Sequence, residues 1–215
     1  MSFKEKKYLV LKKVITKEIA DFAWAYLFLK RKVAQTLFAR QWIHPYEEIH
    51  GYFLDDQVPN TFSIYGDVAM EILLLELLPI MKEKTELDLV PTYSYARIYK
   101  KGDVLERHKD RPSCEISTTL NLGGDAWPIY IDPNPENGFD IEEGVYKPGN
   151  KTGEEIILEP GDMLIYRGCD LEHWREKFEG EKCGQVFLHY NINNKDSIKF
   201  DNRPHLGLPK ELTTE

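Results

Sequence analysis

The tripeptide His108-Lys109-Asp110 could hold a metal ion. In an extended backbone, residues two positions apart point to the same side, about 6 to 7 Å apart, so the histidine and the carboxylate can converge on one ion. A third ligand must come from another strand, and His173 follows a strand-like run and a Pro-Gly-Asp turn. Two histidines and one carboxylate on one face leave three coordination positions open, an arrangement that suits non-haem Fe(II) and its oxygen chemistry.

Two longer stretches give the tripeptide a context, since an isolated His-x-Asp is more simply explained as a surface histidine beside an aspartate. Residues 99–110 read YKKGDVLERHKD, with a tyrosine nine residues before the first histidine and a glycine between them. Residues 158–166 read LEPGDMLIY and precede His173. Both stretches resemble the 2-oxoglutarate and Fe(II)-dependent oxygenases, in particular their prolyl 4-hydroxylase-like branch. The resemblance covers roughly residues 93–191.

This resemblance implies an Fe(II)- and 2-oxoglutarate-dependent dioxygenase, with His108, Asp110 and His173 as metal ligands and catalytic residues. Fe(II) would be the cofactor and O2 a cosubstrate, and 2-oxoglutarate would be oxidatively decarboxylated to succinate and CO2 while the substrate is hydroxylated. The branch favours a peptidyl or free amino acid, so the expected partners are a small-molecule cosubstrate and a peptide or small-molecule substrate. Fold and metal ligands alone do not select the substrate.

Members of this family have a basic residue on the strand after the distal histidine, which pairs with the far carboxylate of 2-oxoglutarate. A carboxylate inside a barrel needs such a cationic partner to offset its lost hydration. Lys182, nine residues after His173, is the first choice. The alternative is that Lys182 belongs to a solvated hairpin at 179–182. Arg175, which shares the face of His173 in an extended strand, is then the rival.

An upstream strand carries four large polar-tipped side chains at alternate positions: Tyr93, Tyr95, Arg97 and Tyr99. The resemblance makes this face the pocket face and matches Tyr99 to the tyrosine that hydrogen-bonds 2-oxoglutarate. Arg97 could contact the cosubstrate or the substrate, or it could pair with an acidic neighbour. Thr119, on the strand after the His-x-Asp loop, lies where relatives offer a hydroxyl to the cosubstrate.

The elements that must position these residues begin with two supporting helices at about 16–84. Thr16 stands at an N-cap position, and the apolar residues after it recur at the three- and four-residue spacing of an amphipathic helix. We expect its apolar stripe, which includes Phe22, Ala23 and Leu27, to pack on a sheet. A second helix is predicted from about 67 to 84, where Pro79 should kink or shorten it.

From Tyr93 the apolar period changes to two, which predicts short antiparallel strands separated by turns. Strands are predicted at 8–15, 93–99, 115–122, 129–132, 154–158, 163–166 and 184–191. Residues 133–151, rich in Pro, Gly, Asn and acidic residues, predict a long loop at the barrel mouth. The expected class is α+β, with a double-stranded β-helix (jelly-roll, cupin-like) core at about 93–191 inside a single domain, 1–215.

Composition limits the partners and the location. A formal charge of −8 and a sequence pI near 5.4 argue against nucleic acid. No apolar run approaches the roughly 20 residues of a membrane span, and the apolar stretch after the basic N-terminus is too short for a secretion signal. Three cysteines without CxxC spacing are expected to be reduced thiols. We therefore expect a cytoplasmic protein that does not enter membranes.

Two other classes of function stay open. A cupin-like metalloenzyme could bind Zn, Mn or Ni through the same three residues without using 2-oxoglutarate. A non-catalytic jelly-roll binding module with a vestigial site is the second, and lost metal binding would favour it. The four remaining histidines lack metal-ligand spacing and are interpreted as surface or packing residues: His44, His50, His189 and His205.

Overall fold

Two antiparallel sheets face each other in the computed structural model, which describes residues 2–44, 46–141 and 145–210. The larger sheet has the order β1-β10-β5-β12-β3-β2 and the smaller one β4-β11-β6-β9. The larger sheet comprises β1 (Tyr8–Leu11), β2 (Phe62–Tyr65), β3 (Leu89–Lys100), β5 (Ile116–Gly124), β10 (Met163–Tyr166) and β12 (Lys182–Ile192). The smaller sheet comprises β4 (Leu105–His108), β6 (Ile129–Ile131), β9 (Glu154–Ile156) and β11 (His173–Arg175). This architecture confirms the predicted α+β jelly-roll.

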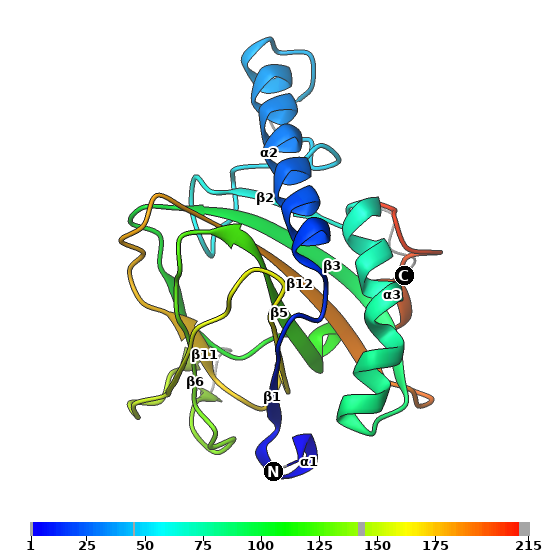
Figure 1. Cartoon of the computed structure of the whole chain (residues 1–215), viewed down its shortest axis with the longest axis vertical. Coiled ribbons are helices and arrows are strands. Elements are labelled where there is room, and N and C mark those ends of the chain that lie inside the picture. The colour runs from blue at the N-terminus through cyan, green and yellow to red at the C-terminus, as the bar shows by residue number, and fades with distance from the viewer. Residues whose placement is uncertain (1, 45, 142–144, 211–215) are drawn as a thin grey trace.

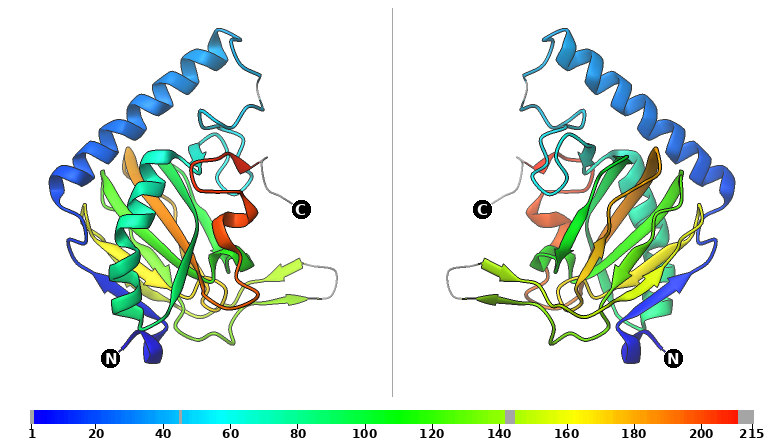
Figure 2. Two further views of the ribbon diagram at one scale, coloured as in Figure 1. Left: turned by 90° about the vertical axis from the view of Figure 1, so that its right-hand side faces the viewer. Right: turned by 90° about the vertical axis from the view of Figure 1, so that its left-hand side faces the viewer.

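Two long helices, α2 (Lys17–Ala39) and α3 (Val68–Thr85), cover one face of the larger sheet (Figures 1 and 2). The far half of α2 extends beyond the sheet (Figure 1). The predicted stripe of α2 is only partly correct even in the near half, because Ala23 and Leu27 are buried while Phe22 is 68% exposed. The shorter helices are α1 (Phe3–Lys6), η1 (Pro112–Cys114) and η2 (Lys199–Asn202).

Local capping explains where the long helices begin. The hydroxyl of Thr16 accepts from the backbone N–H of Ile19 at 3.4 Å, as its N-cap position predicted. Asp67 caps α3 by accepting from the N–H of Ala69 at 3.0 Å. Pro79 was expected to kink or shorten α3, and it does not shorten it, since the helix continues to its C-cap at Glu86. A proline costs most in an isolated helix, and here buried packing against the sheet holds the following turns.

Strand alternation divides the larger sheet into a helix-facing side and an interior side. On β12, Val186 and Leu188 pack with the helices in the main core, whereas Phe187 and His189 face the space between the sheets. Helix α2 comes very close to this strand, because a Cβ at Gly184 would overlap the indole of Trp24. The interior side of the sheet is thus left free to build a site.

The segment 133–151 is not the structureless loop expected from its composition. It contains β7 (Phe139–Ile141) and β8 (Val145–Lys147), which pair with each other as an antiparallel ribbon (Figure 2). The sequence also gave no prediction of β2, β4 or β11, each only three or four residues long. Among the described helices, none has the length and apolarity that crossing a bilayer requires.

Candidate active site

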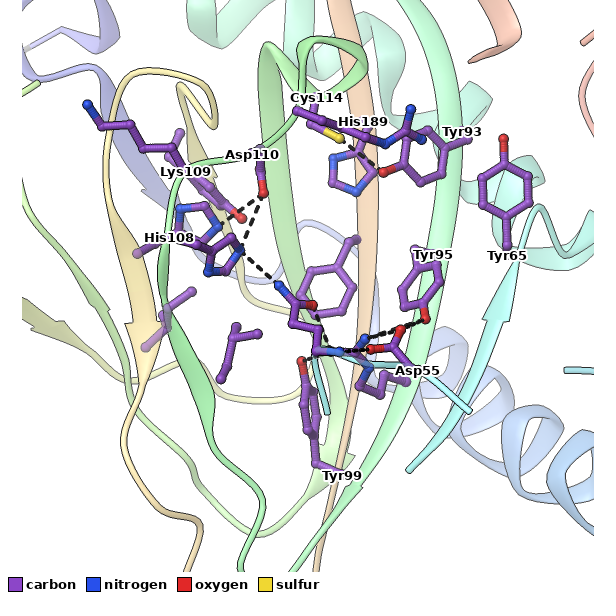
Figure 3. A pocket seen from close by; sticks show the side chains of 18 of the residues that line it. Asp55, Tyr65, Tyr93, Tyr95, Tyr99, His108, Lys109, Asp110, Cys114 and His189 are labelled. Carbon is purple, nitrogen blue, oxygen red and sulfur yellow. Dashed lines mark hydrogen bonds and ion pairs between the residues drawn. The ribbon is translucent and has the colours of Figure 1, made fainter. Parts of the chain in front are cut away.

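The three predicted metal ligands meet at one point between the sheets. Strands β4 and β11 are paired with His108 opposite His173, and Asp110 follows directly after β4. Oδ1 of Asp110 lies 3.3 Å from Nε2 of His173 and 3.6 Å from Nε2 of His108. All three ligand atoms lie within 4.8 Å of one another (Figure 3 shows His108 and Asp110). This is the donor set of an open, facial metal site.

Backbone carbonyls set which nitrogen of each histidine faces the site. Nδ1 of His108 lies 2.6 Å from the carbonyl of Glu106, and Nδ1 of His173 lies 3.1 Å from that of Leu171. A carbonyl only accepts, so in the neutral rings Nδ1 carries the proton and Nε2 keeps its lone pair. Both lone pairs then point toward Asp110, which is how a metal-binding histidine is oriented by its second nitrogen.

The electrostatics of the site also favour a bound cation. Burial alone would raise the pKa of Asp110, but the two neighbouring histidines hold it well below its usual value, so the carboxylate is ionised. Burial opposes the charged form of His108, and the hydrogen bond and charge of Asp110 outweigh it and raise the His108 pKa. Both shifts express a buried negative charge that a metal ion would neutralise.

A cavity of about 380 Å³ opens beside these ligands. The four alternating residues of β3 line it, as the predicted pocket face required: Tyr93, Tyr95, Arg97 and Tyr99. Figure 3 shows the three tyrosines on the side of the pocket across from His108 and Asp110. Aromatic rings make most of this wall, so a ligand beside the metal would contact ring faces and phenol hydroxyls.

The guanidinium of Arg97 is fully engaged within the protein. Its Nε donates to Ser63 Oγ at 3.0 Å, and one of its NH2 groups forms an ion pair with Asp55 at 2.7 Å. Its three other N–H groups meet Gln57 Oε1 (3.2 Å) and the hydroxyls of Tyr99 (3.3 Å) and Tyr95 (3.4 Å). An arginine has five N–H donors, so Arg97 has none left for a further ligand. Of the roles considered for it, pairing with an acidic neighbour is the one that the structure displays.

Arg175 lies deeper in the interior and lacks such a partner. It is 1% exposed, and its guanidinium lies over the ring of Trp127 at 5.1 Å and donates to the Trp127 carbonyl. One NH2 group lies 3.4 Å from Oγ1 of Thr119, while Nε has no hydrogen-bond partner. Within the described residues no carboxylate forms an ion pair with it, and burial lowers its pKa. Arg175 is not itself one of the residues that line the cavity, but it interacts electrostatically with Tyr99 and Tyr166, which do. It is therefore a buried cation behind the cavity wall that an anionic ligand could neutralise.

Lys182, the first choice for the same role, does not reach the pocket. It is exposed at the start of β12, and its ammonium lies over the ring of Phe28 of α2 at 5.2 Å. Lys182 shares the side of β12 that carries Val186 and Leu188, which faces the helices. A one-residue difference in position along a strand sends a side chain to the opposite face.

Several pocket residues were not identified from the sequence. Tyr166 lines the pocket, and Ser117 is buried behind it against Asp110. Both lie on predicted strands, and the alternation that places Thr119 inward could have placed Ser117 inward too. His189, interpreted as a surface or packing residue, is 6% exposed and lies in the pocket wall. Asp55 and Gln57 come from irregular chain, where no periodicity indicates which side chains turn inward.

The fold resembles that of known oxygenases. The sequence matches no protein-family model and no curated protein. Among solved structures, the chain is similar to a prolyl-4-hydroxylase from Pseudomonas putida, with 13% identity, a TM-score of 0.55 and coverage of 89% of this chain and 96% of that one. It is also similar to HygX from Streptomyces hygroscopicus, solved with nickel and 2-oxoglutarate, with 15% identity, a TM-score of 0.58 and coverage of 89% and 85%.

A third similar structure is SnoN, a non-heme alpha ketoglutarate dependent epimerase from nogalamycin biosynthesis. Its identity is 11%, its TM-score 0.59, and the match covers 88% of this chain and 78% of that one. The chain thus has the fold of the 2-oxoglutarate and Fe(II)-dependent oxygenases, prolyl 4-hydroxylases included. The resemblance inferred from residues 93–191 is confirmed at the level of the fold.

Proposed function

We propose that this protein is an Fe(II)- and 2-oxoglutarate-dependent dioxygenase. The observation that carries the proposal is the convergence of His108, Asp110 and His173 at the edge of a cavity, with both Nε2 lone pairs and one carboxylate oxygen facing one point. Three ligands on one side leave the other side open to cosubstrate and O2. Bound Fe(II) would supply O2 activation coupled to the decarboxylation of 2-oxoglutarate to succinate and CO2.

The unpaired guanidinium of Arg175 supports 2-oxoglutarate as the cosubstrate. A buried cation without a counter-ion costs several kcal/mol, and a ligand carboxylate would remove that cost through charge-assisted hydrogen bonds. We assign the far carboxylate to Arg175, with Thr119 beside it and Tyr99 packed edge-on against Trp127 (ring centroids 4.7 Å apart). Arg175, on β11 of the smaller sheet, takes over the role first considered for Lys182, on β12 of the larger sheet.

For the substrate we propose a peptidyl or free amino acid, on the basis of the prolyl 4-hydroxylase-like motifs. Small-ligand sites span roughly 300 to 1,000 Å³, so a cavity of about 380 Å³ suits a cosubstrate and one residue or small metabolite. The solved neighbours are not all prolyl hydroxylases, since HygX was solved with nickel, 2-oxoglutarate and hygromycin B bound. The three cysteines are free thiols, which supports the proposed cytoplasmic location.

The experiment that tests the proposal is anaerobic absorption spectroscopy. Fe(II) and 2-oxoglutarate added to the protein should give a visible metal-to-ligand charge-transfer band at one Fe(II) per chain. His108→Ala, Asp110→Ala and His173→Ala should each abolish it, because each removes one of only three protein ligands. Iron binding without the band would favour the cupin-like metalloenzyme, and loss of metal binding altogether would favour a binding module. Succinate release with peptides and amino acids would then identify the substrate.

A further inference from the structure

The second carboxylate oxygen of Asp110 is held by two side chains that are not themselves candidate metal ligands in the proposed site. Oδ1 faces the two histidines, while Oδ2 lies 2.6 Å from the hydroxyl of Ser117 on β5. Ser117 is paired in the sheet with His189 on β12, and its hydroxyl lies 3.0 Å from Nδ1 of His189. Both residues are buried, with Ser117 at 0% exposure. The three groups therefore form one buried line from β12 to the metal site.

Hydrogen-bond geometry fixes the direction of this line. The Ser117 hydroxyl has one proton to donate. Two acceptors lie within its reach, Asp110 Oδ2 at 2.6 Å and the Cys114 carbonyl at 3.1 Å. An ionised carboxylate is the stronger acceptor, so the proton goes to Asp110. The Ser117 oxygen can then accept from Nδ1–H of His189. His189 thus donates to Ser117, and Ser117 donates to Asp110.

We propose that Ser117 and His189 are positioning residues that keep Asp110 a one-oxygen ligand. With Oδ2 occupied by the Ser117 hydroxyl, only Oδ1 is available to the ion. A carboxylate released from this bond could rotate and present both oxygens, which would fill one of the three positions that cosubstrate and O2 need. The inference rests on the proposed metal centre and adds to it the pair of residues that keeps its coordination sphere open.

Packing around the Asp110 carboxylate independently supports the role of its hydrogen bond with Ser117. The N–H of Asp110 donates to the carbonyl of Gly168 at 2.9 Å. A Cβ at Gly168 would overlap both Oδ2 of Asp110 and Oγ of Ser117. Gly168 does not have a positive φ, so its backbone conformation does not itself call for glycine. The space it leaves is filled by the hydrogen bond between the carboxylate and the hydroxyl.

A competing explanation is that Asp110 is shared with a second metal group. Ligand atoms of Asp110, Cys114 and His189 also lie within 4.8 Å of one another. The Cys114 thiol is buried, however, and bonds with the Tyr93 hydroxyl at 3.0 Å (Figure 3). His189 in turn uses Nδ1 toward Ser117. In the proposal this group supports the carboxylate and does not hold an ion of its own.

Co(II) binding to the full chain tests the inference without turnover. We expect Ser117→Ala to weaken Co(II) binding 10- to 100-fold by calorimetry, the range typical of lost outer-shell partners, and to change the d–d absorption because the coordination changes. Ser117→Thr keeps a hydroxyl and should recover most of the affinity. Ser94→Ala is the matched control, since Ser94 is equally buried and its hydroxyl has no hydrogen-bond partner.

A second variant keeps the test valid if Ser117→Ala folds poorly. His189→Asn retains an N–H near the position of Nδ1 and should bind Co(II) within a few-fold of wild type, whereas His189→Leu should behave like Ser117→Ala. Wild-type affinity and spectrum in both Ser117→Ala and His189→Leu would overturn the proposal. A thiolate-to-cobalt charge-transfer band that disappears in Cys114→Ser would also overturn it. Failure of the wild type to bind Co(II) would instead overturn the metal centre itself.

Discussion

Two buried arginines on neighbouring parts of the barrel differ in how their charge is compensated. Arg97 is 2% exposed, pairs with Asp55 and has an acceptor for each N–H group. Arg175 is 1% exposed, has an unpartnered Nε and has no ion pair among the described residues. Because an uncompensated buried charge is costly, the first arginine is explained by the protein alone and the second is not. The difference indicates that Arg175, and not Arg97, would bind an anionic ligand.

The largest effect is expected where the compensated arginine is removed. Arg97→Met should lower the free energy of unfolding by about 3 to 5 kcal/mol, because Asp55 would remain buried without its partner. Urea denaturation of the metal-free protein measures this change. Adding Asp55→Asn to Arg97→Met should recover part of the loss, since the stranded charge is then gone. A single-variant loss below about 1 kcal/mol would show that this pair is not structural.

Removal of Arg175 should instead leave the stability of the protein intact and weaken the binding of 2-oxoglutarate. Arg175→Met should leave the metal-free protein at least as stable as wild type, because it replaces a buried unpaired charge with an apolar side chain. It should weaken 2-oxoglutarate binding by about 2 to 4 kcal/mol, roughly 30- to 1,000-fold. Fe(II) affinity should change little. Titration of the anaerobic absorption band with 2-oxoglutarate measures the first constant, and titration with Fe(II) at saturating 2-oxoglutarate measures the second.

Lys182→Ala is the control for that experiment. Its ammonium is exposed and outside the pocket, so 2-oxoglutarate binding should match wild type. The assignment would be reversed if Lys182→Ala lost cosubstrate affinity and Arg175→Met did not.

A third arginine, Arg111, extends the comparison to pH through its ion pair with Asp201. Asp201 accepts from both NH2 groups of Arg111, at 2.9 and 2.6 Å, and from the hydroxyl of Tyr65 at 2.7 Å. Burial would raise the pKa of Asp201, but these bonds lower it to about 2, below its ordinary value near 4. Its contribution is therefore fully present above pH 4 and is lost as the pH falls toward 2.

Asp201→Asn should remove this dependence on pH. The variant should be less stable than wild type by about 2 kcal/mol at pH 7, and the gap should narrow between pH 4 and pH 2. Unfolding midpoints measured across that range test the prediction. A gap that stays constant with pH would mean that the charge of Asp201 is not what stabilises this region.

The smallest effect concerns the loop anchored by Arg97. Arg97 donates to Oε1 of Gln57, so the NH2 end of the amide faces Nε2 of His108 at 3.2 Å. This donor competes with a metal for the lone pair of His108. Gln57→Ala should therefore raise Fe(II) affinity by about 1 kcal/mol or less, as calorimetry would show. Weaker binding in the variant would instead make Gln57 a support of the metal centre.

The sequence alone determined the features that depend on neighbours along the chain. Strand β10 was predicted with its observed bounds, and the cap at Thr16 and the pair His108 and Asp110 follow from local spacing. His173 was added from its place after a strand-like run and a turn and from the family resemblance. Period-two alternation also placed Arg97 and Tyr99 on one face of their strand, and the family resemblance made it the pocket face. These features are local because a strand's two faces, a helix cap and an i, i+2 pair are set by adjacent residues.

Only the tertiary structure decided the rest. Whether Lys182 or Arg175 enters the barrel depends on which face of β12 and of β11 turns inward, and that is decided only when each strand pairs with distant partners. Asp55 reaches Arg97 across 42 positions, and Ser117 reaches His189 across 72. Such contacts leave no periodic trace in the sequence, because the energy that selects them is gained only once distant segments pack together. For that reason the ligands could be predicted and the residues that hold them in place could not.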